Sequence, residues 1–251
     1  MNNSNTHINS YRINMLVETN HCVLNGDPNN EAGQRINDNG YGYVTDVCIA
    51  RLIKNYLAYK GKELAIDGVK TGEDFKGMTE KVALERFIDL RLFGAMLKTP
   101  GKKGEKTDIS VARCVNTTMA ETTQPIIPQK DSITRMMEAT KGKEKNSTMG
   151  TQNFVEHATF AINMVVSGRQ AEKNGVTKED LDLLFEAMKN WPKVLEGPRA
   201  GRVEVIHLEI TECEDNLVPS HMNTQWAWQA KLANLYALGS ERCRDNEKAR
   251  T

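Results

Sequence analysis

The sequence predicts an α+β fold of the ferredoxin-like, split βαβ kind, in which two long insertions interrupt the core. Segments with the alternation of half-buried strands and segments with the periodicity of amphipathic helices follow one another in the order strand, helix, strand, strand, helix, strand. The turn-rich segments between them are too long to be simple connections. A chain of 251 residues with 39% hydrophobic residues is long enough to bury such a core.

The first strand is followed by a loop that the sequence predicts to hold a fixed shape. Tyr11, Ile13, Met15 and Val17 alternate with polar residues, which is the period of a half-buried strand. Residues 20–45 then carry Asn-Gly, Asp-Pro and Gly-x-Gly pairs, which favour defined turns. The loop therefore delivers the chain to the first helix in a set direction.

The first helix is predicted at residues 45–59, with Gly61 as its stop. One apolar stripe is formed by Ile49, Ile53, Tyr56 and Leu57. A second face carries Arg51, Lys54, Asn55 and Ala58. We expect core contacts on one side of this helix and cations on the other.

The first insertion is predicted at residues 62–107. Gly68, Gly72 and Gly77 mark turns, residues 81–97 have the pattern of a single helix, and residues 100–104 form a basic loop. The second strand is expected at residues 109–115, where Val111 and Arg113 lie on the face opposite Ala112.

The second insertion is predicted at residues 116–152, which show too little periodicity for a simple hairpin. The third strand follows at residues 154–166. The second helix begins at a capping box formed by Thr177 and Asp180, and its apolar stripe consists of Leu181, Leu184, Phe185 and Met188. The fourth strand is expected at residues 203–210.

Charge and cysteine content limit the function classes. Lys plus Arg and Asp plus Glu are equal at 33 each, which argues against a generic polycation for nucleic acids. Five widely spaced cysteines show no metal-ligand spacing, so a reduced, metal-free interior is expected. No apolar run is long enough to cross a bilayer and the N-terminus is polar, which predicts a cytoplasmic protein without a membrane partner.

Four motifs occur in order along the chain. They are Asn25-Gly26-Asp27-Pro28 continuing through Arg35 to Gly40-x-Gly42-x-x-x-Asp46-Val47-Cys48, then Asp89-Leu90-Arg91-Leu92-Phe93-Gly94-Ala95, Ser132-Ile133-Thr134-Arg135-Met136 and Thr148-Met149-Gly150. Together they span roughly residues 11–210 and resemble the repeating backbone subunit of type I CRISPR interference complexes (Cascade), closest to the type I-C branch.

This resemblance implies an RRM-like palm at residues 11–221, with insertions at 20–45 (loop), 62–107 (web or fingers) and 116–152 (thumb). A polar tail at residues 1–10 would precede the palm, and a helical tail at 222–251 would follow it. Such subunits belong to prokaryotic antiviral defence and polymerise head to tail, as a helical filament, on a CRISPR RNA (crRNA). They contact other Cascade subunits and present the guide for pairing with target DNA. They are not enzymes and need no cofactor.

The RNA contacts that the resemblance implies are Asn25, Gly26, Arg35, Arg51, Lys54, Arg113, Ser132, Arg135, Met136, Met137 and Lys141. Arg51 and Lys54 are one helical turn apart and could reach adjacent phosphates, although a solvated helix face gives the same pattern. Met136 and Met137 could wedge against a displaced base or simply pack in a core.

Two alternatives remain open. A type III backbone subunit would cleave target RNA with a thumb-loop aspartate, for which Asp131 is the candidate. A ferredoxin-like enzyme would gather Asp27, Asp46 and Asp89 into a metal site. Metal-dependent cleavage of complementary RNA would favour the first alternative, and stabilisation by Mg²⁺ without RNA would favour the second.

Overall fold

A computed structural model describes residues 7–100, 108–135 and 148–217 of the chain. For residues 134, 135, 148 and 149 only the backbone is described. The described residues all belong to one unit, Met1–Pro219. The helical tail predicted at residues 222–251 lies outside them.

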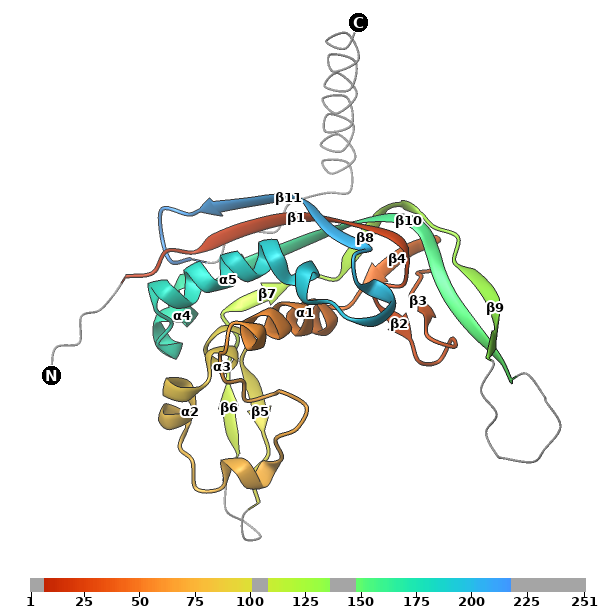
Figure 1. Cartoon of the computed structure of the whole chain (residues 1–251). Helices are drawn as coiled ribbons and strands as arrows, with labels where there is room; N and C mark the ends of the chain where they lie inside the picture. Colours follow the sequence, from red (N-terminus) through yellow and green to blue (C-terminus); the bar gives the residue numbers. More distant parts are fainter. Residues whose placement is uncertain (1–6, 101–107, 136–147, 218–251) are drawn as a thin grey trace, which may run out of the picture. The chain divides into compact units, whose positions relative to one another are not determined.

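An antiparallel seven-stranded sheet forms the centre of this unit (Figure 1). Its path runs in the order β11-β1-β10-β8-β4, and β7 and β9 also pair with β10. The strands are β1 (Tyr11–Cys22), β4 (Tyr41–Val44), β7 (Val115–Thr117), β8 (Ala120–Pro125), β9 (Gln129–Arg135), β10 (Thr148–Val166) and β11 (Val203–Glu212). Two small sheets pair β2 (Gly26–Asp27) with β3 (Gly33–Gln34), and β5 (Ala95–Leu97) with β6 (Ile109–Val111).

Helices α1 and α5 lie side by side on one face of the sheet (Figure 1). The α-helices are α1 (Asp46–Tyr59), α2 (Glu80–Arg86), α3 (Ile88–Phe93), α4 (Gly168–Asn174) and α5 (Lys178–Asn190). Short 3-10 helices are η1 (Gly72–Phe75), η2 (Trp191–Val194) and η3 (Gly197–Arg199). No helix among the described residues is both long and apolar enough to cross a membrane.

The predicted split βαβ core is confirmed. Its elements are β1, α1, β7, β10, α5 and β11 in chain order, and β11, β1, β10 and β7 pair in that spatial order. Alternate residues of β1, such as Ile13 and Met15, are fully buried against the two helices. The predicted capping box of α5 is present, with Thr177 and Asp180 each accepting a hydrogen bond from the other's backbone.

A second hydrophobic cluster lies within residues 64–111 and is called the small lobe below. Phe75, Phe87, Leu90, Leu97 and Ile109 are buried together there, separately from the core of the sheet. Helix α3 connects the lobe to the helical face of the central sheet, and the chain leaves the lobe after β6. Its described residues lie within 64–100 and 108–111.

The single helix predicted at residues 81–97 is wrong. Phe87 adopts an extended conformation (φ −109°, ψ 112°) that separates α2 from α3, because its side chain turns into the lobe's cluster. Gly94 ends α3 with a φ of 58°, and a side chain there would meet the backbone of Val111 and Arg113. The chain then continues as β5.

The strand predicted at residues 109–115 is also wrong, because it is divided between two sheets. β6 pairs with β5 inside the small lobe, whereas β7 pairs with β10 in the central sheet. Arg113 lies in the bend between them rather than on a strand. The bend is held by Asn174, whose side-chain amide donates to the carbonyls of Arg91 and Ala112 at 2.8 Å each.

Residues 116–152 contain more regular structure than the sequence indicates. β8 joins the central sheet, and β9 pairs with the first part of β10 to form a two-stranded arm (residues 129–135 and 148–154). The arm projects from the sheet in Figure 1. Ile133 in the arm is 40% exposed, so the arm lacks the buried face that would give an apolar alternation.

Candidate nucleic-acid interface

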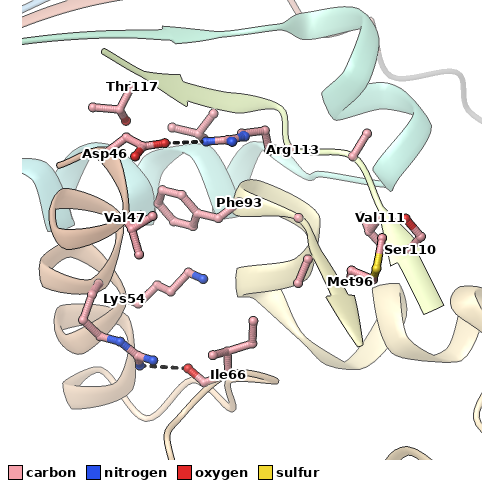
Figure 2. A pocket seen from close by; sticks show the side chains of 16 residues that line it. Asp46, Val47, Lys54, Ile66, Phe93, Met96, Ser110, Val111, Arg113 and Thr117 are labelled. Carbon is pink, nitrogen blue, oxygen red and sulfur yellow. Dashed lines mark hydrogen bonds and ion pairs between the residues drawn. The ribbon is translucent and has the colours of Figure 1, made fainter. Parts of the chain in front are cut away.

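Three of the predicted RNA-binding cations surround one pocket. Arg51 and Lys54 reach it from α1, and Arg113 reaches it from the bend before β7 (Figure 2). The pocket has a volume of about 690 Å³, and residues 93–96 and 110–112 form much of the wall opposite α1. The first motif of the sequence and the small lobe therefore meet at this cavity.

The N-terminus of α1 is fixed by the loop that precedes it. The Thr45 hydroxyl accepts a hydrogen bond from the backbone N–H of Cys48 (3.3 Å). Asn25 Oδ1 in turn accepts from the backbone N–H (3.0 Å) and the hydroxyl of Thr45. Thr45 is therefore the capping residue of this helix, and Asp46 belongs to its first turn.

Asp46 occupies the first turn of α1 and pairs with Arg113 across the pocket. The Arg113 guanidinium lies 3.0 Å from the Asp46 carboxylate, and its side chain is 52% exposed. A carboxylate is also favoured at this position by the helix dipole. Arg113 is thus accessible to an anionic ligand, which would have to share the guanidinium with Asp46.

The loop of residues 25–35 is organised around Gln34, whose side chain is buried. Gln34 Oε1 accepts from the backbone N–H groups of Leu24 (3.0 Å) and Asn25 (3.3 Å), and Nε2 donates to the carbonyl of Tyr43 (2.9 Å). Gly26 is also required, because a Cβ there would lie 2.7 Å from the carbonyl oxygen of Ala32. Asn25 and Gly26 therefore have structural roles in shaping this loop.

Replacing Gln34 with leucine should lower the free energy of unfolding by about 2–4 kcal/mol, because two backbone N–H groups would lose their acceptor in a buried site. Chemical denaturation monitored by circular dichroism measures this loss. Gln124→Leu on β8 is the matched control, because Gln124 is exposed. Equal stability of the two variants would show that Gln34 does not hold the loop.

Arg35 is the last residue of this loop and directly follows β3. Its guanidinium is 3.7 Å from the Asp27 carboxylate, and its side chain is 24% exposed. It does not line the pocket formed by Arg51, Lys54 and Arg113. The structure therefore separates Arg35 from the three pocket cations.

The expectation that α1 presents its cations to solvent is wrong for Lys54. The residue is only 8% exposed, because α1 is covered by the sheet on one side and by the start of the small lobe on another. Its Nζ lies 4.0 Å from Asp89 Oδ2 and 5.3 Å from the centre of the Phe93 ring. Burial lowers the pKa of the Lys54 ammonium, and the Asp89 carboxylate opposes that shift.

Arg51 has a structural bond in the same region. Its Nη1 donates to the backbone carbonyl of Ile66 at 2.8 Å (Figure 2). Asp89 is completely buried and accepts from the backbone N–H groups of Ala65 (2.8 Å) and Ile66 (3.1 Å). The motif residues on α1 and α3 thus fasten the start of the small lobe to the palm.

The remaining predicted contacts lie on or beyond the arm. Ser132 is exposed on β9 opposite Thr151, and Arg135 pairs with Thr148 through its backbone. The base of the arm is joined to the loop by Asn153, whose amide donates to the carbonyl of Glu31 (2.6 Å), and by a Lys130–Glu31 ion pair. Met136, Met137 and Lys141 lie outside the described residues.

Sequence reasoning gave no role to the apolar walls of the pocket. Val47 and Met96 are 72% and 67% exposed, and Phe93 lines the interior. Two signals were present: the stretch from Asp89 to Ala95 was recognised as a motif, and Val47 belongs to the first motif. Their meeting could not be inferred, because Val47 lies on α1 before the insertion, whereas Phe93 and Met96 lie near the end of the insertion.

The three aspartates of the alternative metal site have separate partners. Asp27 lies beside Arg35, Asp46 pairs with Arg113, and Asp89 accepts from backbone N–H groups. Within the described ranges, no three His, Cys, Asp or Glu side chains are grouped so that they could hold a metal ion. The geometry therefore does not assemble the predicted acidic cluster.

Comparisons with known proteins identify what the chain resembles. Residues 9–218 match the family model described as CRISPR-associated protein Cas7. A chain of a solved CRISPR RNA-guided surveillance complex in a pre-nicking state is 13% identical, with a TM-score of 0.59, and the match covers 94% of this chain and 89% of that one.

A chain of a second CRISPR RNA-guided surveillance complex is 17% identical, with a TM-score of 0.53, and the match covers 94% of this chain and 84% of that one. At these identities the two likenesses show the fold. No curated protein matches the chain.

Proposed function

The chain belongs to the Cas7 family, and on that premise we propose that it is a non-catalytic, crRNA-binding backbone subunit of a type I interference complex. It would polymerise head to tail along the guide and present the guide's bases to target DNA. Its partners would be CRISPR RNA, further copies of itself, other Cascade subunits and, through the guide, target DNA. Such a complex would work in the cytoplasm.

The grouping of Arg51, Lys54 and Arg113 around one pocket is the observation that carries this proposal. Cations set together on one helix and one neighbouring bend can follow a strand of phosphates, and each neutralised phosphate releases counterions. Arg113 is the most suitable phosphate ligand of the three, because its guanidinium is half exposed. The base edges would remain free for pairing, as in other guide-dependent systems.

We further propose that the small lobe is the web of the family and the arm is the base of its thumb. Arg35, Ser132, Arg135, Met136, Met137 and Lys141 would contact RNA from the loop and the thumb side. Assignment to the type I-C branch rests on the motif resemblance alone. Asn25 and Gly26 would act by holding the loop rather than by contacting RNA through a side chain.

Co-expression with a repeat-spacer RNA and the partner subunits tests the proposal. The protein should elute as an assembly with an absorbance ratio, at 260 over 280 nm, that indicates bound nucleic acid. Nuclease protection would then show a protected fragment in the recovered material. Elution of an RNA-free monomer under these conditions would overturn the proposal.

The non-catalytic part of the proposal has its own test. The assembled protein should leave complementary target RNA intact in the presence of Mg²⁺. Metal-dependent cleavage that disappears in Asp131→Ala would instead support the type III alternative, because Asp131 lies on β9 at the base of the thumb.

Replacing Arg113 with glutamine should weaken RNA binding similarly for all sequences and reduce the slope of log affinity against log salt by about 1. This result is expected because the variant loses one phosphate contact, while its contacts to the bases do not change. Fluorescence anisotropy at several salt concentrations measures the slope. Arg86→Gln is the control, because Arg86 is an exposed arginine of the small lobe paired with Glu63 and does not line the pocket. An unchanged slope in Arg113→Gln would remove that residue from the interface.

A further inference from the structure

We propose that the loop of residues 25–35 and the end of β1 form a clamp on the base of the arm, with Asn153 and Phe154 as positioning residues. We further propose that RNA bound by this loop orders the arm through the clamp. Only this second part rests on the proposed function, because the clamp is a property of the protein without RNA. The clamp explains a strained stretch of backbone that RNA binding alone would not require.

Strained residues gather at the base of the arm. Among the residues that the structure describes, three non-glycine residues have a positive φ: His21 (49°), Glu31 (47°) and Ala32 (61°). His21 and Glu31 both contact the base of the arm, and Ala32 directly follows Glu31. A positive φ is unfavourable for a residue with a Cβ and persists only where surrounding contacts hold it. These contacts therefore indicate what the strain serves.

Glu31 and Ala32 are the central residues of a tight turn. The backbone N–H of Gly33 closes the turn by donating to the carbonyl of Asn30 at 2.7 Å. Two successive positive φ values are the pattern that Asn-Gly and Gly-Gly satisfy at least cost. The presence of a glutamate in this turn is therefore explained by what Glu31 contacts, and not by the preference of the turn.

Both strands of the arm are fastened to Glu31. Lys130 on β9 and Asn153 on β10 are direct cross-strand partners, so their side chains project from the same face of the arm. The Asn153 amide donates to the Glu31 carbonyl at 2.6 Å, and the Lys130 ammonium pairs with the Glu31 carboxylate. Asn153 also lies close to the loop backbone, because a Cβ at Gly33 would be 3.9 Å from Asn153 Cγ.

The opposite face of the arm is held by an aromatic contact. Phe154 follows Asn153 along β10, so its side chain projects from the other face. Its ring stacks on the His21 imidazole, with 5.9 Å between the ring centroids and 18° between the ring planes. The carbonyl of His21 accepts a hydrogen bond from Arg202 Nη1 at 2.6 Å, which helps to hold this strained residue in place. The arm is therefore held on both faces at its base.

Asp27 connects the clamp to Arg35. The Asp27 carbonyl accepts from the backbone N–H groups of Asn30 (3.0 Å) and Ala32 (2.9 Å), and its carboxylate lies 3.7 Å from the Arg35 guanidinium. A phosphate bound by Arg35 would therefore act next to the residue that shapes the turn carrying Glu31. RNA that restricts this loop would give the arm a fixed attachment, and an ordered arm would in turn favour RNA binding.

Asn153→Leu tests the clamp in the RNA-free, full-length protein. Backbone amides of the arm should exchange with deuterium about fivefold faster than in the unmodified protein, which is the usual effect of losing one hydrogen bond. Amides of α5 should exchange as before, which shows that the variant is folded. Gln152→Leu is the matched control, because Gln152 precedes Asn153 and projects from the opposite face of the arm. Unchanged exchange in Asn153→Leu, or equal acceleration in both variants, would overturn the clamp.

The same measurement with a bound single-stranded oligouridylate tests the coupling. RNA should slow exchange in the arm of the unmodified protein, and should slow it less in Asn153→Leu. Equal slowing in both proteins would show that RNA acts on the arm directly, and binding without slowing would show that the loop and the arm are independent; either result overturns the coupling. If the oligouridylate does not bind and the co-expressed protein retains no guide RNA, the proposed function fails, whereas the RNA-free comparison still decides the clamp.

Discussion

Replacing Arg91 with methionine should lower the free energy of unfolding by about 3–5 kcal/mol, because it leaves the Asp180 carboxylate buried without its counter-charge. Arg91 Nε and Nη2 bind both oxygens of Asp180 at 2.7 and 2.8 Å. Asp180 is only 6% exposed and also belongs to the capping box of α5. Urea denaturation followed by circular dichroism measures the change.

The chain offers a closely matched control for this variant. Arg86 binds both oxygens of Glu63 with the same two-pronged geometry, at 2.8 and 2.6 Å, but this pair is exposed to solvent. Arg86→Met should therefore change stability little, because water screens an exposed pair and replaces its bonds. Similar losses in the two variants would show that burial of the Arg91–Asp180 pair is not what makes it important.

Lys54→Glu should be strongly destabilising, since it places a second carboxylate beside the buried Asp89. Two like charges about 4 Å apart repel by about 4 kcal/mol at the effective dielectric usual for proteins, and the Lys54 attraction is lost as well. Limited proteolysis should cut the variant within residues 64–111, because the attachment of the small lobe to α1 is broken. Denaturation of the purified variant gives the loss of stability.

Asn55→Glu is the control on the adjacent, exposed position of α1 and should remain resistant to the protease. If Lys54→Glu is equally resistant and equally stable, the Lys54–Asp89 contact does not hold the lobe. The comparison also affects how RNA binding is tested. Loss of RNA binding in Lys54→Glu would reflect a detached lobe as well as a lost cation, because the Lys54–Asp89 contact is broken in that variant.

The elements with one clearly buried face were predictable from the sequence. β1 alternates inward residues such as Ile13 and Met15 over its first part, and α1 and α5 carry apolar stripes with recognisable starts at Thr45 and Thr177. Their order was enough to give the split βαβ core. The four motifs gave the family, which the match over residues 9–218 confirms.

The arm was not predictable because it has no buried face to create a pattern. β9 and the first part of β10 are held together by backbone pairing from Arg135–Thr148 to Gln129–Phe154. Backbone hydrogen bonds do not depend on side-chain polarity, so the sequence there resembles a loop. The break at Phe87 was missed for a related reason: its side chain is apolar in either a helix or a bend.

The cations that line the site were predictable from the sequence, but the burial of Lys54 was not. Arg51, Lys54 and Arg113 were selected as cations, and the structure places all three around one cavity. The burial of Lys54 depends on Asp89 and Phe93, which are separated from it by more than a helix and a loop of chain. The sequence pattern of α1 alone cannot show that the small lobe packs against the charged face of this helix.

The length of β10 has a mechanical consequence. It is one uninterrupted strand of 19 residues, roughly 60 Å long at the usual rise, and it changes partner between Phe154, opposite β9, and Val155, opposite β1. The arm is therefore a direct continuation of a strand of the central sheet, without an intervening loop. In the proposed filament, the arm of each copy would therefore be positioned by a strand of that copy's own central sheet.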